Sequence, residues 1–215
     1  MFSGIQDIGL ILICYLIGSI PFGVIISRAF FGFDIRSKGS GNMGSTNVFR
    51  VMGKKWGIAV QILDILKGVL PVLLVRYFYA DNLSLELVAG IAAVIGHIFP
   101  IFSSFKGGKG INTLVGILLA ISPIDILLAL FVFLALFLST GIVSLGSIFG
   151  AITISISLFL RNILSESGVE GFNTLFPFFI VISILVIITH RKNIKRLFAG
   201  RENRFDLPWL TKSKL

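Results

Sequence analysis

The chain contains a single cysteine, Cys14, which lies inside an apolar run. One cysteine excludes an intramolecular disulfide and argues against a cysteine-based metal site. Charge is also scarce, because only 13% of the 215 residues are Asp, Glu, Lys or Arg, about half of their share in soluble domains. The sequence shows no internal repeat, low-complexity segment or cluster of metal ligands. We therefore expect neither a bound metal nor another cofactor.

Hydrophobic residues supply 55% of the chain, and the mean hydropathy is +0.99, outside the range of soluble domains. Several apolar runs reach the roughly 20 residues that a helix needs to cross a hydrocarbon core of about 30 Å. We predict an all-α integral membrane protein, a polytopic bundle that forms one membrane-embedded domain over residues 1–215. The candidate spans are Ile5–Phe31, Gly53–Tyr79, Leu83–Phe102, Ile111–Leu138, Ser144–Leu160 and Leu175–Thr189. The first span lacks basic residues before its apolar run, so we expect a retained helix rather than a cleavable signal.

Basic residues crowd three of the gaps between spans, at 28–55, 106–109 and 191–214. Such residues mark the cytoplasmic side of a membrane protein. We therefore interpret the excess of 19 basic over 10 acidic residues as a topology signal, and we expect no nucleic-acid partner. The sparse acidic residues suit the opposite face: Asp7, Asp81, Glu86, Asp125, Glu166 and Glu170.

An even number of crossings must lie between the second and third basic segments, yet hydropathy shows three apolar runs there. We predict that the run Ile111–Leu138 is a hairpin broken near Ser122, because Pro123 removes a backbone donor and Asp125 favours water. Its two arms would have roughly 11 and 14 residues. About seven transmembrane helices result, with the N-terminus outside and the C-terminus cytoplasmic.

A loop of small and amide residues, Gly39–Asn47, lies between the first two spans and is followed by Arg50. Its glycines, Gly39 and Gly41 among them, let several backbone N–H groups turn towards one anion. Side chains along the loop add neutral donors: Ser40, Asn42, Ser45, Thr46 and Asn47. Arg50 adds a planar charged group suited to phosphate. The loop indicates an anion site at the membrane surface, and a solvated turn is the competing interpretation.

A second glycine-rich loop, Phe105–Gly110, contains Lys106 and Lys109 and directly precedes an apolar run. It is not a P-loop, because Ser103 stands where the first glycine belongs, Gly110 stands where a Ser or Thr would hold magnesium, and no strand precedes it. Lys109 nevertheless lies among flexible amides at a predicted helix start, where the helix dipole favours an anion. The two loops together predict sites for two phosphate groups. A pure topology signal is the alternative for the second loop.

Asp64, Lys67 and His97 are titratable residues inside the second and third apolar spans. Asp64 and Lys67 are three residues apart, so they share a helix face and can pair within the bundle. Ionised groups there cost roughly 2.5–3.5 kcal/mol each on insertion scales, which argues for a role in orienting helices or in handling substrate. His97, near the inner end of its span, could donate to phosphate, accept a proton or be purely structural.

Polar residues also mark the C-terminal half of the chain. Ser144 and Ser147 begin an apolar span and by themselves are typical of helix caps. A polar cluster follows the last span: His190, Arg191, Asn193, Lys195 and Arg196. Attraction to anionic lipid heads is the simplest interpretation of this cluster.

Taken in order along the chain, these motifs resemble those of the bacterial PlsY-type acyl-phosphate:glycerol-3-phosphate acyltransferases. The resemblance covers nearly the whole chain and rests on Gly18–Gly23, Gly39–Arg50, Asp64–Gly68, Gly96–His97, Phe105–Gly110 and His190–Ile194, continued by Arg196, Leu197, Gly200 and Glu202. Ser45 and Asn112 depart from the pattern, because alanine is common at both positions. Gly141 and Ile142 replace a basic and aromatic pair before Ser144.

The resemblance implies a seven-helix enzyme of the bacterial cytoplasmic (inner) membrane, with its active site at the cytoplasmic face. Its reaction would transfer a fatty acyl group from acyl phosphate to the C1 hydroxyl of glycerol 3-phosphate, giving lysophosphatidic acid and inorganic phosphate in the first step of phospholipid synthesis. Matching the motifs assigns catalysis to Ser40, Arg50, Lys109, His190 and Asn193. We expect substrate binding by Gly39, Gly41, Asn42, Thr46, Asn47, His97, Gly107, Gly108, Gly110, Ser144 and Arg191. We expect a monomer surrounded by membrane lipids.

We hypothesise direct attack of the hydroxyl on the acyl carbonyl, because phosphate leaves a mixed anhydride with little need of protonation. The general base stays open among His97, His190, Asp64 and a substrate phosphate.

A transporter or flippase for an anionic small molecule or lipid is the alternative, since broken helices and charged residues within spans also mark transport pathways. Against it, the polar motifs gather on one face. A non-catalytic lipid-binding scaffold would not need two glycine-rich loops.

Overall fold

The computed structural model describes residues 4–80 and 82–208, and it contains helices but no β-strand over those residues. Asp81 and the last basic residues of the tail therefore lie outside the described residues. Helices satisfy their backbone polar groups within one segment, as a hydrocarbon environment demands. The all-α prediction is confirmed. The chain divides into two compact units, Met1–Ile121 and Ser122–Leu215.

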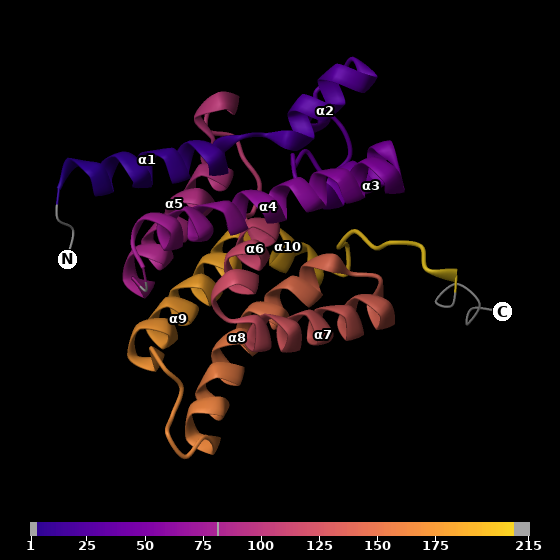
Figure 1. Cartoon of the computed structure of the whole chain (residues 1–215). Helices are drawn as coiled ribbons and strands as arrows, with labels where there is room; N and C mark the ends of the chain where they lie inside the picture. Colours follow the sequence, from indigo (N-terminus) through magenta and orange to yellow (C-terminus); the bar gives the residue numbers. More distant parts are fainter. Residues whose placement is uncertain (1–3, 81, 209–215) are drawn as a thin grey trace. The chain divides into compact units, whose positions relative to one another are not determined.

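The first unit is built around four helices that pack closely in pairs: α1 with α5, α5 with α4, and α4 with α6 (Figure 1). Glycines allow these close approaches, because a Cβ on Gly68 would collide with the Thr113 carbonyl and one on Gly116 with the Ile65 carbonyl. Small residues at helix interfaces are typical of membrane bundles. Its helices are α1 (Ile5–Ser19), α2 (Phe22–Phe31), η1 (Ile35–Ser37), α3 (Ser45–Met52), α4 (Lys54–Phe78), α5 (Leu83–Ile98), η2 (Ile101–Ser103) and α6 (Ile111–Ile121).

The first predicted span, Ile5–Phe31, is broken in two. Ile20 has extended backbone angles, and α2 begins only after Pro21. Proline restricts the residue before it to extended conformations and cannot donate a backbone hydrogen bond. The break exposes the carbonyl oxygen of Ile20 at the end of α1, and the Lys67 Nζ donates a hydrogen bond to it at 2.9 Å.

The second unit consists of α7 (Pro123–Thr140), α8 (Val143–Leu164), α9 (Phe172–Thr189) and the short α10 (Arg191–Phe198). Helix α8 packs against both α7 and α9 (Figure 1). The predicted break before Pro123 is confirmed, because α6 ends at Ile121 and the proline opens α7, the position where its missing N–H costs least. Helix α6 has the expected 11 residues, whereas α7 has 18 and runs on to Thr140.

The sequence predicted that Asp125 would face water, but the structure buries it. Its carboxylate is fully buried and accepts hydrogen bonds from Ser122 and Ser157, both at 2.5 Å. The Arg161 Nη1 donates a third bond at 2.6 Å. A buried carboxylate is tolerable when it is paired and hydrogen-bonded, and here it ties the first turn of α7 to α8.

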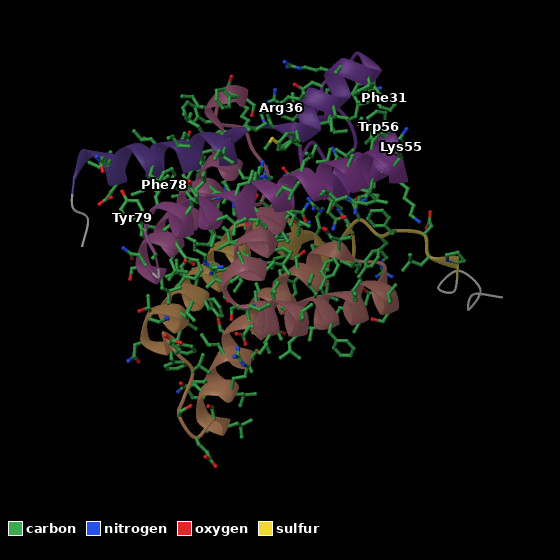
Figure 2. The ribbon with its side chains drawn as sticks, in the orientation of Figure 1. Phe31, Arg36, Lys55, Trp56, Phe78 and Tyr79 are labelled. Atoms are coloured by element: carbon green, nitrogen blue, oxygen red, sulfur yellow. The ribbon has the colours of Figure 1, made fainter. Side chains whose placement is uncertain are left out.

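Length and composition allow six helical segments of the described residues to cross a membrane: Gln6–Phe31, Lys54–Phe78, Leu83–Ser103, Pro123–Thr140, Val143–Leu164 and Phe172–Thr189. Helix α6 is apolar but shorter. Aromatic side chains mark both ends of α4, with Trp56 beside Phe31 at its start and Phe78 and Tyr79 at its end (Figure 2). Aromatic belts of this kind lie at the two membrane interfaces.

Candidate active site

The first glycine-rich loop is organised by the buried side chain of Asn47. Its Oδ1 accepts a hydrogen bond from the Ser40 N–H at 2.8 Å. Its Nδ2 lies within hydrogen-bond distance of the carbonyl oxygens of Ile35, Lys38 and Asn42, at 3.2, 3.0 and 2.8 Å. Gly39 has a φ of 60°, and a Cβ there would collide with the Asn47 amide. The loop therefore wraps around one side chain and needs glycine at this turn.

Several backbone N–H groups that we expected to face an anion are used within the loop. The Ser40 N–H bonds to Asn47, the Gly41 N–H to the Lys38 carbonyl, and the Gly44 N–H to the Asn42 Oδ1. Helix α3 begins at Ser45, immediately after these turns. The first N–H groups of a helix lack the usual partner four residues earlier, and here the Gly44 carbonyl accepts the Asn47 N–H at 3.0 Å. The part of this loop that the helix dipole makes attractive to an anion is therefore the very start of α3.

A salt bridge fixes the base of the same loop. Asp34 accepts hydrogen bonds from Arg36, whose Nη2 lies 2.7 Å from Oδ2, and from the Arg28 Nη2 at 2.8 Å. These bonds, the one from Arg36 above all, hold the pKa of the Asp34 carboxyl well below its usual value. The Arg36 Nη1 also donates to the Ser103 carbonyl at 3.0 Å. Arg36, labelled in Figure 2, thereby connects the first loop to the segment that precedes the second.

The second glycine-rich loop rests on His97. The Gly108 N–H donates a hydrogen bond to the His97 carbonyl at 3.0 Å. A Cβ on Gly107 would collide with that carbonyl, and one on Gly108 would collide with the imidazole Nε2. Gly110 has a φ of 81°, and α6 starts at the next residue. The backbone of the loop lies against α5 as only glycine allows, and Lys109 stands half-buried at the start of α6.

One hydrogen bond joins the starts of the two helices. The Asn112 Nδ2 in the first turn of α6 donates to the Ser45 Oγ in the first turn of α3 at 2.9 Å. Helix N-termini carry a partial positive charge that favours anions. The structure therefore brings the two predicted anion loops together, with half-buried Arg50 later in α3 and Lys109 just before α6.

The second unit gathers polar groups around Glu202. The Ser144 Oγ and the Asn193 Nδ2 donate to its Oε1 at 2.9 and 2.5 Å, and the Arg196 Nε donates to its Oε2 at 2.6 Å. Burial alone raises the pKa of Glu202, but the hydrogen bonds from Arg196, Asn193 and Ser144 outweigh it, so the pKa lies below its ordinary value. The sequence predicted no site role for Glu202, which matched only the C-terminal part of the family pattern. Its signal is an acidic residue within a basic tail.

The helix-cap interpretation of the two serines is wrong. Helix α8 begins at Val143 and has no side-chain cap, so Ser144 lies inside the first turn. The Ser144 hydroxyl donates to Glu202 instead, and the Ser147 Oγ donates back to the Val143 carbonyl at 3.0 Å. The tail that follows α10 supplies the partner of Ser144, which the local sequence does not indicate.

His190 occupies the junction of α9 and α10 and is buried. Its Nδ1 lies 2.8 Å from the Val186 carbonyl oxygen. Because a carbonyl oxygen only accepts, Nδ1 carries the proton, and in a neutral imidazole Nε2 then holds the lone pair. Asn193 follows on the first turn of α10, while Arg191 beside it is exposed.

No metal site is formed by the side chains that the structure describes, because they contain no group of three His, Cys, Asp or Glu residues close enough to share an ion. Apart from the paired carboxylates of Asp34 and Glu202, the polar groups of the site described above are amides, hydroxyls, cations and helix starts. Such groups bind and orient anions and stabilise negative charge.

Comparison with known proteins gives a consistent result. The sequence pattern of the family described as "Glycerol-3-phosphate acyltransferase" matches residues 8–200. A protein of that name from Chlorobaculum parvum is 40% identical, with 92% of this chain and 95% of the relative aligned. Another from Aquifex aeolicus is 46% identical, with 91% of this chain and 97% of the relative aligned.

Two solved structures are similar as well. The glycerol 3-phosphate form of PlsY, an integral membrane glycerol 3-phosphate acyltransferase, superposes with a TM-score of 0.83 at 40% identity, over 94% of this chain and 96% of that one. The lysophosphatidic acid form gives a TM-score of 0.81 at 39% identity. Both comparisons extend over nearly the full length of the chain.

Proposed function

The chain belongs to the glycerol-3-phosphate acyltransferase family of integral membrane proteins, and from this premise we propose that its acyl donor is acyl phosphate. The acyl group passes to the C1 hydroxyl of glycerol 3-phosphate, and the products are lysophosphatidic acid and inorganic phosphate. The observation that carries the proposal is the Asn112–Ser45 hydrogen bond, which joins the starts of α3 and α6. Two adjacent helix starts suit a reaction in which both substrates carry phosphate.

The two solved forms of PlsY support the choice of ligands. One is described as the glycerol 3-phosphate form and the other as the lysophosphatidic acid form. The same family identity makes the apolar helices of this chain membrane spans. A protein that spans the membrane is in contact with the lipid phase, which suits an enzyme whose product is a lipid.

The first unit neutralises phosphate charge in this proposal. Lys109 and Arg50 supply full positive charges, and the starts of α3 and α6 supply partial ones. Ser40, Asn42 and Thr46 line the first loop, whereas Asn47 shapes it from within. Phosphate is a good leaving group from a mixed anhydride, so orientation and charge stabilisation account for most of the catalysis.

The proton acceptor is chosen from the groups that the sequence left open. Of the groups that the sequence left open, His190 is the one whose hydrogen bond fixes a tautomer, with Nδ1–H towards Val186 and the lone pair on Nε2. We assign it the role of general base for the C1 hydroxyl. Asn193 donates an amide hydrogen to Glu202, which fixes the orientation of its side chain, and we assign it a role in orienting substrate. The Ser144 proton goes to Glu202, so Ser144 meets a substrate only as an acceptor.

The remaining expectations complete the proposal. The protein works as a monomer and a single domain in the bacterial inner membrane, with its N-terminus outside. Its basic segments, the two glycine-rich loops and α10 then lie at the cytoplasmic side. Gly39, Gly41, Gly107, Gly108 and Gly110 shape the loops, and exposed Arg191 adds a positive charge for substrate binding.

Product analysis with parallel donors tests the proposal. Purified protein in detergent is mixed with glycerol 3-phosphate and either palmitoyl phosphate or palmitoyl-CoA, and lysophosphatidic acid is measured. We expect product with palmitoyl phosphate only. Product with palmitoyl-CoA alone would overturn the donor assignment. The absence of product with both, together with uptake of glycerol 3-phosphate into proteoliposomes, would establish the transporter instead.

A further inference from the structure

A charged cluster lies inside the first unit, among Asp64 and Lys67 of α4 and His97 of α5. The exposed fractions of these residues are 2%, 2% and 3%. The Lys67 Nζ lies 2.9 Å from the Asp64 Oδ1 and donates to the Ile20 carbonyl at 2.9 Å. Insertion scales set the cost of ionised groups within a span at roughly 2.5–3.5 kcal/mol each. A cluster that costs this much needs a role beyond the apolar packing around it.

The cluster touches the second glycine-rich loop through His97. The His97 carbonyl accepts the Gly108 N–H at 3.0 Å, and the space for a Cβ on Gly108 is filled by the imidazole Nε2. Gly107 rests on the same carbonyl. The shape of the loop directly before Lys109 is therefore set by the position of one histidine.

The edge of the imidazole that carries Nδ1 is turned towards the Asp64–Lys67 ion pair. The His97 Nδ1 lies 3.7 Å from the Asp64 Oδ1, farther than a hydrogen bond, and no described group bonds to this nitrogen. The ring stands between the carboxylate on one side and the glycine backbone on the other. Asp64 is itself fixed by Lys67, which also holds the end of α1 at Ile20.

We propose that His97 is a positioning residue, set by the Asp64–Lys67 pair, that holds the Gly107–Gly108 backbone in the shape that presents Lys109 and the start of α6 to phosphate. This inference rests on the proposed function and replaces the direct substrate contact that the sequence assigned to His97. The end of α1 at Ile20 and the second glycine-rich loop are then both held by the same buried cluster of Asp64, Lys67 and His97. Loss of the support lowers affinity for a phosphate ligand while the chemical groups stay present.

Four variants separate this role from general stability. His97→Ala removes the support, and His97→Gln keeps a polar side chain of similar reach. Asp64→Asn removes the charge that faces the ring. Glu86→Gln is the matched control, because Glu86 is also buried, pairs with Arg76 of α4 at 2.8 Å, and lies on α5 eleven residues before His97, which is about 16 Å along the helix.

The first readout is the split between KM and kcat in the acyltransferase assay. We expect His97→Ala to raise the KM for at least one of the two phosphate-bearing substrates by about tenfold or more, with kcat within about threefold of wild type. His97→Gln should recover part of the loss, and Glu86→Gln should leave both constants unchanged. A fall in kcat with both KM values unchanged would identify His97 as a catalytic residue and overturn the inference.

The second readout does not require turnover. Inorganic phosphate should raise the unfolding temperature of the wild type and of Glu86→Gln, and it should fail to protect His97→Ala and Asp64→Asn. Equal protection of all variants would contradict the positioning role, as would the absence of protection in the wild type. If phosphate protects the wild type but not His97→Ala and Asp64→Asn, and no product forms, the proposed function is refuted while the positioning role is supported.

Discussion

The amide of Asn112 donates a hydrogen bond to the hydroxyl of Ser45 at 2.9 Å, and this bond joins the first turns of α6 and α3. Each residue alone is a departure from the pattern that the sequence resembles, since alanine is common at both positions. The structure shows that the two departures are partners. A small polar pair takes the place of two apolar side chains between the glycine-rich loops.

A double-mutant cycle tests this partnership. Asn112→Ala leaves the buried Ser45 hydroxyl without its donor, and Ser45→Ala leaves the Asn112 amide without its acceptor. Each single variant should be destabilised by about 1 kcal/mol, and the double variant by less than the sum. The measurement is the unfolding free energy in detergent. Strictly additive losses would show that the bond contributes no coupling.

Asn47 should be intolerant of substitution. Asn47→Ala removes the acceptor for the Ser40 N–H and the donors to three backbone carbonyls. Buried groups left without partners cost about 1–3 kcal/mol. Asn47→Asp keeps the acceptor but loses the donors, so it should destabilise as well. We expect both variants to unfold at lower temperature than the wild type and to lose most of their activity. Wild-type activity in Asn47→Asp would contradict the claim that the Asn47 amide holds the first loop in shape.

Gly108→Ala should impair the enzyme more than an alanine elsewhere. Its Cβ would collide with the His97 imidazole, whereas a Cβ on Gly9 in α1 meets nothing within 4 Å. Gly9→Ala is the matched control and should be neutral or slightly stabilising, because alanine favours the helix by about 1 kcal/mol over glycine. Steady-state kinetics and unfolding temperatures of the pair give the comparison. Similar values for both variants would show that the second loop has room to move.

Glu202 should make stability depend on acid pH. Its folded-state pKa lies below the ordinary value of 4.5, so its ionised form stabilises the folded protein above that pH and the contribution is lost as the pH falls through the folded-state pKa. Glu202→Gln cannot titrate. The difference in unfolding temperature between wild type and Glu202→Gln should therefore be largest near neutral pH and shrink below about pH 4.5. A constant difference would contradict the pairing.

Local patterns predicted those features that local physics decides. Pro123 ends one helix and opens the next wherever the rest of the chain lies, so the broken run was predictable. The glycines before Lys109 likewise predict a loop. Apolar runs of sufficient length identified the spans, although Pro21 divides the first of them.

Features that depend on a distant partner could not be predicted in this way. Asp125 was expected in water, because the sequence does not show that Ser157 and Arg161 of α8 surround it. Ser144 was interpreted as a cap, because its acceptor Glu202 lies 58 positions further along the chain. In both cases a tertiary hydrogen bond overrides the preference of the residue in isolation.

The central claim is that a hydroxyl of glycerol 3-phosphate attacks the acyl carbonyl of acyl phosphate. Glycerol 3-phosphate with heavy oxygen in its C1 hydroxyl distinguishes the possible routes when the purified protein is given palmitoyl phosphate. We predict equal amounts of lysophosphatidic acid and inorganic phosphate, with the label in the new ester and none in the released phosphate. Label in a phosphate product, or release of phosphate without lysophosphatidic acid, would contradict the account.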